Sequence, residues 1–196
     1  MDRTAARPLV IVSAFATSLL IGLLVMLWAL GGARGVTPAA IGGPFQLTDQ
    51  SGDTVTDKNM QGRPTLIFFG FTHCPDVCPT SLFEMSEVLR AMGKDADRVN
   101  AYFITVDPER DNAATMKDYL SSFDPHLKGL TGDPAAVAKV TSEYRVYFKK
   151  VPLKDGDYTM DHTALTYLMD RDGKFVSPFN LNRTPQQAAA DLKQYL

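Results

Sequence analysis

The first hydrophobic segment of the chain is its longest and contains no charged residue. It runs from Pro8 to Leu30, and as a helix its 23 residues would extend about 34 Å, at about 1.5 Å per residue. This length is enough to cross a bilayer, and the segment lacks the polar face of an amphipathic helix. We therefore expect a transmembrane anchor. The alternative is a cleaved signal peptide ending near Gly31 and Ala33, but the apolar run exceeds the usual signal-peptide core of about 7–15 residues.

Charges on either side of this segment predict its orientation. Arg3 and Arg7 precede the segment and only Arg34 follows closely, so the positive-inside rule places the N-terminus in the cytoplasm. We expect a single-pass protein of the bacterial inner membrane with its domain in the periplasm, or of the mitochondrial inner membrane if the source is eukaryotic. The predicted parts are a cytoplasmic N-terminus, an anchor, a Gly/Pro/Ala-rich linker and one domain, at residues 1–7, 8–30, 31–43 and 44–196.

Beyond the linker, short apolar runs alternate with segments of helical period. The sequence "FQLTDQSGDTVTD" alternates around a Ser-Gly-Asp turn and predicts a hairpin of Phe45 to Thr48 and Thr54 to Thr56. Two continuous apolar runs, "PTLIFFGF" and "VNAYFITVD", predict strands buried on both faces. Further strands are predicted within residues 127–133 and on both sides of the turn at residues 170–173. Helices are predicted within residues 79–93, 112–123, 134–150 and 184–196.

This alternation predicts the fold class. Strands that alternate with helices form an α/β domain with a central mixed sheet flanked by helices, and the last strand pair adds an antiparallel edge. The composition is ordinary, with 45% hydrophobic residues, 21% charged residues and a formal net charge of −2. A basic excess is absent, which argues against a nucleic-acid partner. The sequence also lacks the glycine-rich phosphate loops and the "GxSxG" elbow of common enzyme families.

The two cysteines of the chain are the first candidates for chemistry. Cys74 and Cys78 lie where the strand "PTLIFFGF" meets the following helix. Free N–H groups and the helix dipole favour thiolates at such a junction. On a first helical turn, a spacing of four residues places both cysteines on the same side, with their sulfurs close enough to form a disulfide or to bind one soft ion. Cu(I) accepts two or three such ligands, whereas Zn(II) usually takes four.

A third ligand would come from one of three histidines. His162 precedes a predicted strand, whose end could lie beside the cysteine loop, and is the strongest candidate. His73 is adjacent to Cys74, where side chains diverge, so a tuning or packing role suits it better. His126 lies in a polar loop and is expected to be solvated. Three further residues flank the site and could tune its charge or simply be solvated: Asp76, Met160 and Asp161.

Residue chemistry alone supports two kinds of site equally. One is a copper centre with two cysteines and a histidine, and the other is a thiol–disulfide couple. An oxidising compartment would close the cysteine pair unless a partner keeps it reduced.

Four segments, in order, resemble the Sco/SenC family of membrane-anchored, thioredoxin-like proteins that assist copper-site assembly in cytochrome c oxidase. They are "FFGFTHCPDVCPTSL", "FITVDPERD", "VYFKK" and "MDHTALTYLMDRDGKF", and the likeness extends from about Gly43 to the C-terminus. The resemblance implies a thioredoxin-like fold with an extra N-terminal hairpin. It also implies a copper site made of Cys74, Cys78 and His162. The "DPERD" segment, Asp107 to Asp111, matches too, but we expect it to be a strand-to-helix turn in which Asp111 caps the helix.

The function that this resemblance implies is a copper carrier and not a turnover enzyme. Each chain would bind one copper ion, as Cu(I) or, in a second form, as Cu(II). The ion would pass to the dinuclear copper centre of cytochrome c oxidase subunit II. Other copper chaperones or thioredoxin-like reductants are further expected partners. The alternative is a thiol–disulfide oxidoreductase in which Cys74 and Cys78 reduce the cysteines of that client. Three residues between the cysteines, instead of the two in thioredoxins, favour metal, with the disulfide as an oxidised resting form.

Overall fold

The computed structural model describes residues 6–30, 40–154 and 156–196. The chain divides after Ala39 into two units, of which the second contains residues 40–196. The predictions for residues 1–5 and 31–39 lie outside the described residues. The first unit contains one helix, α1, from Ala6 to Leu30.

The middle of α1 presents apolar side chains on all sides. Within its own unit these side chains are exposed, as illustrated by Phe15 and Leu19. The Thr17 hydroxyl donates back to the carbonyl oxygens of Ser13 and Ala14, both at 3.0 Å, so this polar group is satisfied within the helix. Among the described residues, no helix has both the length and the apolar character needed to cross a membrane.

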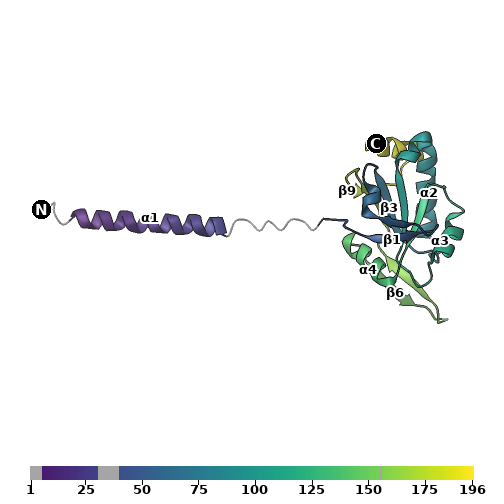
Figure 1. Ribbon diagram of the computed structural model, residues 1–196, viewed down its shortest axis with the longest axis horizontal. Coiled ribbons are helices and arrows are strands. Elements are labelled where there is room, and N and C mark those ends of the chain that lie inside the picture. The colour runs from purple at the N-terminus through teal and green to yellow at the C-terminus, as the bar shows by residue number, and fades with distance from the viewer. Residues whose placement is uncertain (1–5, 31–39, 155) are drawn as a thin grey trace. The chain divides into compact units, whose positions relative to one another are not determined.

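A seven-stranded mixed sheet forms the centre of the second unit (Figure 1). Its strand order is β2-β1-β5-β4-β3-β8-β9. The strands are β1 (Gln46–Asp49), β2 (Thr54–Thr56), β3 (Thr65–Gly70), β4 (Asn100–Thr105), β5 (Leu127–Thr131), β8 (Thr166–Met169) and β9 (Phe175–Pro178). Strand β3 pairs in parallel with β4 and antiparallel with β8, and β4 pairs in parallel with β5. The predicted N-terminal hairpin is confirmed by the antiparallel pairing of β1 and β2.

The apolar runs of the sequence form the centre of this sheet. All six residues of β3 are buried, as expected for a strand that is covered on both faces. The last residues of β3 and β4, Gly70 and Thr105, are neighbours in the parallel register. The loops that follow these two strands therefore begin at the same edge of the sheet.

Helices flank the sheet, and some of them begin at a residue whose side chain caps the first turn. They are α2 (Val77–Met92), α3 (Ala113–Leu120), α4 (Pro134–Glu143) and α5 (Pro185–Lys193), with short 3-10 turns η1 (Asp57–Met60) and η2 (Gly93–Arg98). Asp133 caps α4 and Thr184 caps α5, and each is followed by a proline. Helix α5, at the yellow C-terminal end, lies beside α2 (Figure 1).

One prediction about secondary structure was wrong. The helix expected over residues 134–150 ends at Glu143, and Arg145 has a positive φ of 56°. The chain then forms a separate hairpin of β6 (Phe148–Pro152) and β7 (Tyr158–His162). This hairpin was missed because β6 is exposed along nearly its whole length and lacks the alternation that marks a half-buried strand.

Candidate metal centre

The two cysteines lie on different local elements. Cys78 is the second residue of α2, whereas Cys74 lies in the loop between β3 and α2. The prediction that both belong to the first helical turn is therefore right only for Cys78. The Cys78 N–H points at the Cys74 Sγ, with 3.4 Å between the two atoms, so the start of the helix faces that sulfur. Both residues are buried, and neither forms a disulfide.

Gly70 provides the space for the Cys78 sulfur. A Cβ atom added at this last position of β3 would lie 2.7 Å from the Cys78 Sγ and 2.8 Å from a ring carbon of Phe103. These distances are well below the roughly 3.5–4.0 Å of a normal carbon contact. The glycine is required here by close approach, because Cys78 packs directly on the strand backbone.

His162 reaches the cysteines from the β6–β7 hairpin. It is the last residue of β7, and its Nε2 lies 3.5 Å from the Cys78 Sγ. The rings of Phe71 and Phe68 meet the imidazole at steep angles, with centroids 5.7 Å and 6.3 Å away. Its Nδ1 lies 3.1 Å from the carbonyl oxygen of Thr163. A carbonyl can only accept, so Nδ1 carries the proton and Nε2 keeps a lone pair facing the cysteines.

These three side chains form a donor set that fits a soft metal ion. The two Sγ atoms and a ring nitrogen of His162 all lie within 4.8 Å of one another. Two sulfur donors and one imidazole suit copper, because thiolates select soft ions and Cu(I) accepts three ligands. The histidine chosen from the sequence is thus the one that the fold brings to the cysteines.

The other candidate residues lie outside this group. His73 is half exposed, and its Nδ1 lies 3.1 Å from its neighbour, the Thr72 hydroxyl. His126 is not simply solvated, because its Nδ1 lies 2.7 Å from an oxygen of the buried Asp124. Asp76 and Asp161 are exposed and do not join the donor group, and Met160 is buried.

The two thiols share a proton unequally. The hydrogen bond from the Cys78 side chain lowers the pKa of Cys74 from 9.0 to about 4, with help from the backbone at Asp76 and Cys78. Burial opposes this shift. The same hydrogen bond, together with burial, raises the pKa of Cys78. In the reduced metal-free protein, Cys74 is therefore a thiolate and Cys78 is the thiol that donates to it.

The Asp107 to Asp111 segment is more than a turn. Helix α3 is capped by Asn112, whose side chain accepts from the Thr115 N–H at 3.0 Å, so the prediction that Asp111 is the cap was wrong. Asp111 is instead fully buried and accepts hydrogen bonds from Thr72, two residues before Cys74. The sequence signal that could have indicated this role is a carboxylate shortly after strand β4, because the end of β4 adjoins the end of β3.

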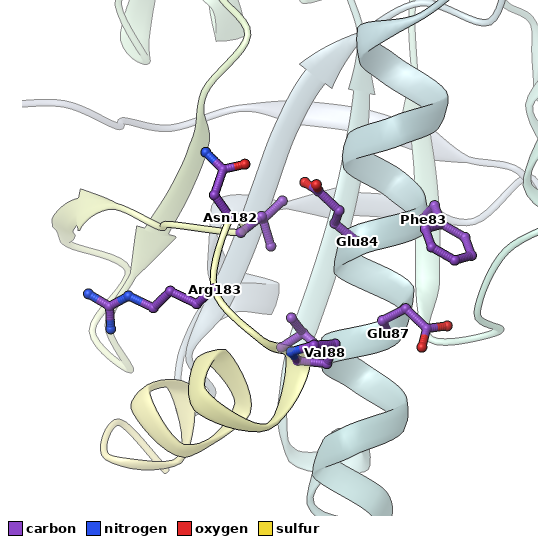
Figure 2. Close-up of a pocket in the computed structure, with 8 residues that line it drawn as sticks. Phe83, Glu84, Glu87, Val88, Asn182 and Arg183 are labelled. Atoms are coloured by element: carbon purple, nitrogen blue, oxygen red, sulfur yellow. The ribbon is translucent and has the colours of Figure 1, made fainter.

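A separate hollow of about 280 Å³ lies along α2 (Figure 2). Glu84 of α2 and Asn182 face each other across it, and Phe83 is among the residues that line it. None of the three metal-centre side chains lines this hollow.

The sheet, the flanking helices and the loop before α2 define a thioredoxin-like α/β domain that carries a Cys–Cys–His centre. The chain matches the family model SCO1/SenC over residues 34–196 and belongs to this family. The matched relatives come from bacteria and from mitochondria.

Individual relatives agree with this assignment. The structure of Bradyrhizobium japonicum ScoI with copper bound is 81% identical with a TM-score of 0.79, and the match covers 80% of this chain and 100% of that chain. Yeast Sco1 with copper bound is 39% identical with a TM-score of 0.72, covering 80% of this chain and 88% of the yeast chain. A SCO2-like protein of Rickettsia felis is 40% identical over 155 residues, which are 78% of this chain and 76% of the relative.

Proposed function

We propose that Cys74, Cys78 and His162 bind one copper ion, which the protein carries as cargo. The observation that supports this proposal most strongly is the convergence of two sulfurs and one imidazole nitrogen within 4.8 Å from two segments that are distant in the sequence. The low pKa of Cys74 supplies a thiolate without a proton to displace. Copper-bound structures of relatives, one of them 81% identical, support copper as the metal.

The proposed client is the copper-bearing subunit II of cytochrome c oxidase, to which the ion would pass by exchange of ligands. Membership of the SCO1/SenC family supports this client, because the family consists of copper-binding proteins that act in cytochrome c oxidase assembly. Exposed apolar side chains next to the ligands also favour a protein partner. Val77 precedes Cys78, Phe148 pairs with His162 across the hairpin, and Leu165 follows His162 by three residues; all three are exposed.

Removing the imidazole tests the ligand assignment. We expect His162→Ala to weaken copper binding more than about 100-fold, since even partners behind a ligand typically contribute about 10–100-fold. The matched control is His126→Ala, which removes an imidazole that lies against Asp124 and Asp97, outside the donor group, and should leave copper affinity unchanged. Competition with a chromophoric Cu(I) chelator measures both. Unaltered affinity in His162→Ala, or a large loss in His126→Ala, would show that the assignment is wrong.

A second function, thiol–disulfide exchange with the client's cysteines, is favoured by one observation. Cys74 is a thiolate beside a second thiol, which is the arrangement of a dithiol reductant. His162→Ala separates the two functions, because it should abolish delivery of copper and leave a dithiol that can still reduce a disulfide. A variant that still supports oxidase assembly without copper supplementation would favour the reductase.

We also propose that residues 8–30 anchor the protein in a membrane with residues 1–7 in the cytoplasm. The charge-free sequence, the exposed apolar surface in the middle of α1 and the internal hydrogen bonds of Thr17 support this proposal. An anchor would hold the carrier beside a membrane-embedded client and raise its effective concentration. The full chain should resist carbonate extraction from membranes, and Leu20→Lys with Leu24→Lys should release it; extraction of the unmodified chain would refute the anchor.

A further inference from the structure

The turn after β4 contacts both parts of the proposed copper site. Three charged residues of this turn face inward: the side chains of Asp107 and Arg110 are 3% and 16% exposed, and Asp111 is fully buried. None of them belongs to the donor group. Their buried charges therefore need another explanation, because charges are rarely buried without a specific partner.

Asp111 fixes the loop that carries Cys74. Its carboxylate accepts from the Thr72 N–H at 3.0 Å and from the Thr72 hydroxyl at 2.6 Å. The Thr105 hydroxyl at the end of β4 donates to the same carboxylate at 2.7 Å. Charge-assisted hydrogen bonds of this kind are among the strongest in proteins. The loop two residues before Cys74 is thus tied to the end of the neighbouring strand.

Arg110 fixes the hairpin that carries His162. Its Nη1 donates to the carbonyl oxygen of Tyr158, the first residue of β7, at 2.9 Å. Its guanidinium carbon lies 3.7 Å from the centroid of the Tyr158 ring, in cation–π contact. The Tyr158 hydroxyl donates to Asp107 at 2.9 Å, and Asp107 also accepts from the Arg110 Nε at 2.5 Å. Each of the three residues Arg110, Tyr158 and Asp107 therefore contacts the other two.

The two arms start from one short piece of backbone. The N–H groups of Arg110 and Asp111 both donate to the carbonyl oxygen of Asp107, at 3.2 Å and 3.0 Å. Phe71 lies between the arms, with its ring centroid 5.7 Å from that of His162 and 5.9 Å from the Arg110 guanidinium carbon. The cysteine loop and the histidine hairpin, which are distant in the sequence, thus share one support.

We propose that Asp107, Arg110 and Asp111 are positioning residues that set the separation of Cys74 and His162 by holding the cysteine loop and β7 on one turn. This inference rests on the proposed copper site. The β6–β7 hairpin forms its own two-stranded sheet, so it lacks strand pairing to the main sheet among the described residues. Its place beside the cysteines depends instead on side-chain contacts such as those of Arg110. If the hairpin that carries His162 were loose, copper binding would have to order it, and the entropy lost in that ordering would lower the affinity for copper.

The experiment compares copper-loaded full-length variants. Arg110→Ala removes the hairpin arm, and Thr72→Ala removes one hydrogen bond of the cysteine arm. Arg63→Ala is the control, since it deletes an exposed arginine that donates to the Asp97 carbonyl oxygen. The Cu(II) form reports each arm separately: nitrogen hyperfine structure in the paramagnetic resonance spectrum reports His162, and the thiolate-to-copper absorption band reports the cysteines.

In Arg110→Ala we expect the nitrogen signature to be lost, the thiolate band to remain and copper affinity to fall about 10–100-fold. Thr72→Ala should shift the thiolate band and keep the nitrogen signature, and Arg63→Ala should resemble the unmodified protein. If Arg110→Ala does not fold, Tyr158→Phe replaces it. This variant loses only the hydrogen bond from the Tyr158 hydroxyl to Asp107, so it should weaken the nitrogen signature several-fold less than loss of the Arg110 side chain would.

Two results would overturn the inference. One is an Arg110→Ala protein with unmodified spectra and affinity. The other is a set of variants in which affinity falls only in proportion to stability in urea, with both spectral features unchanged. His162→Ala in the same series separates this inference from the proposed site: a retained nitrogen signature there refutes the ligand assignment, whereas its loss in His162→Ala but not in Arg110→Ala refutes only the positioning role.

Discussion

Replacing Gly70 with alanine would test how closely the end of β3 approaches the Cys78 sulfur. The new methyl group would lie 2.7 Å from this sulfur and 2.8 Å from Phe103, whereas ordinary contacts need about 3.5–4.0 Å. The sulfur or the start of α2 must therefore move by about 1 Å, and metal ligands tolerate only about 0.5 Å. Overpacking of this kind typically costs about 1–3 kcal/mol of stability. We expect such a loss together with an at least tenfold weaker affinity for copper, which corresponds to about 1.4 kcal/mol.

Gly129→Ala is the matched control for this variant. A Cβ at this position of β5 would lie 2.7 Å from the Leu120 Cδ1 and 2.9 Å from the Met116 Cε, which are flexible ends of core side chains away from the site. Urea unfolding measures the stability of both variants, and chelator competition measures their copper affinity. Gly129→Ala should lose some stability and keep its affinity. A Gly70→Ala protein that binds copper like the unmodified one would refute the reasoning about close approach.

Two predictions concern pH. Because the pKa of Cys74 is about 4, its alkylation rate in the reduced metal-free protein should be nearly constant between pH 5.5 and 7.5; a tenfold rise per pH unit would contradict this, and Cys78→Ala should restore a rising rate. Hydrogen bonds with Asp124, and to a lesser extent with Asp97, raise the pKa of His126 above 6.5. The contribution of His126 to stability is therefore complete below pH 6.5 and is lost as the pH rises through the raised pKa. His126→Ala should therefore destabilise the protein by up to about 1 kcal/mol at pH 5.5 and by less at pH 9 in urea unfolding, and an equal loss at both pH values would refute this linkage.

The hydrophobic pattern of the sequence predicted the part of the site that contains the two cysteines. The apolar run of β3 and the helical period of α2 placed the cysteines at a strand-to-helix junction, which the fold confirms. These signals are strong because a buried central strand needs apolar residues at every position. The conformation of Cys74 could not be predicted, since whether a residue just before a helix joins its first turn depends on the loop contacts of Thr72.

Long-range contacts explain what the sequence could not predict. His162 was expected to lie just before a strand, and β8 does follow it at Thr166, but His162 itself ends the unpredicted strand β7. The exposed hairpin has little apolar pattern and is held by Arg110, which is 48 residues from Tyr158 along the chain. Asp111 similarly serves Thr72, 39 residues away. The role of Asp111 follows from the adjacency of β3 and β4, which periodicity alone does not specify.

X-ray absorption spectroscopy of the copper-loaded full chain would test the central claim most directly. The account predicts one copper per chain with two sulfur neighbours and one nitrogen neighbour. In His162→Ala the nitrogen neighbour should disappear, and in Cys78→Ser one sulfur should be lost. An unchanged copper environment in His162→Ala, or a copper ion without sulfur neighbours, would contradict the assignment of Cys74, Cys78 and His162 as the site.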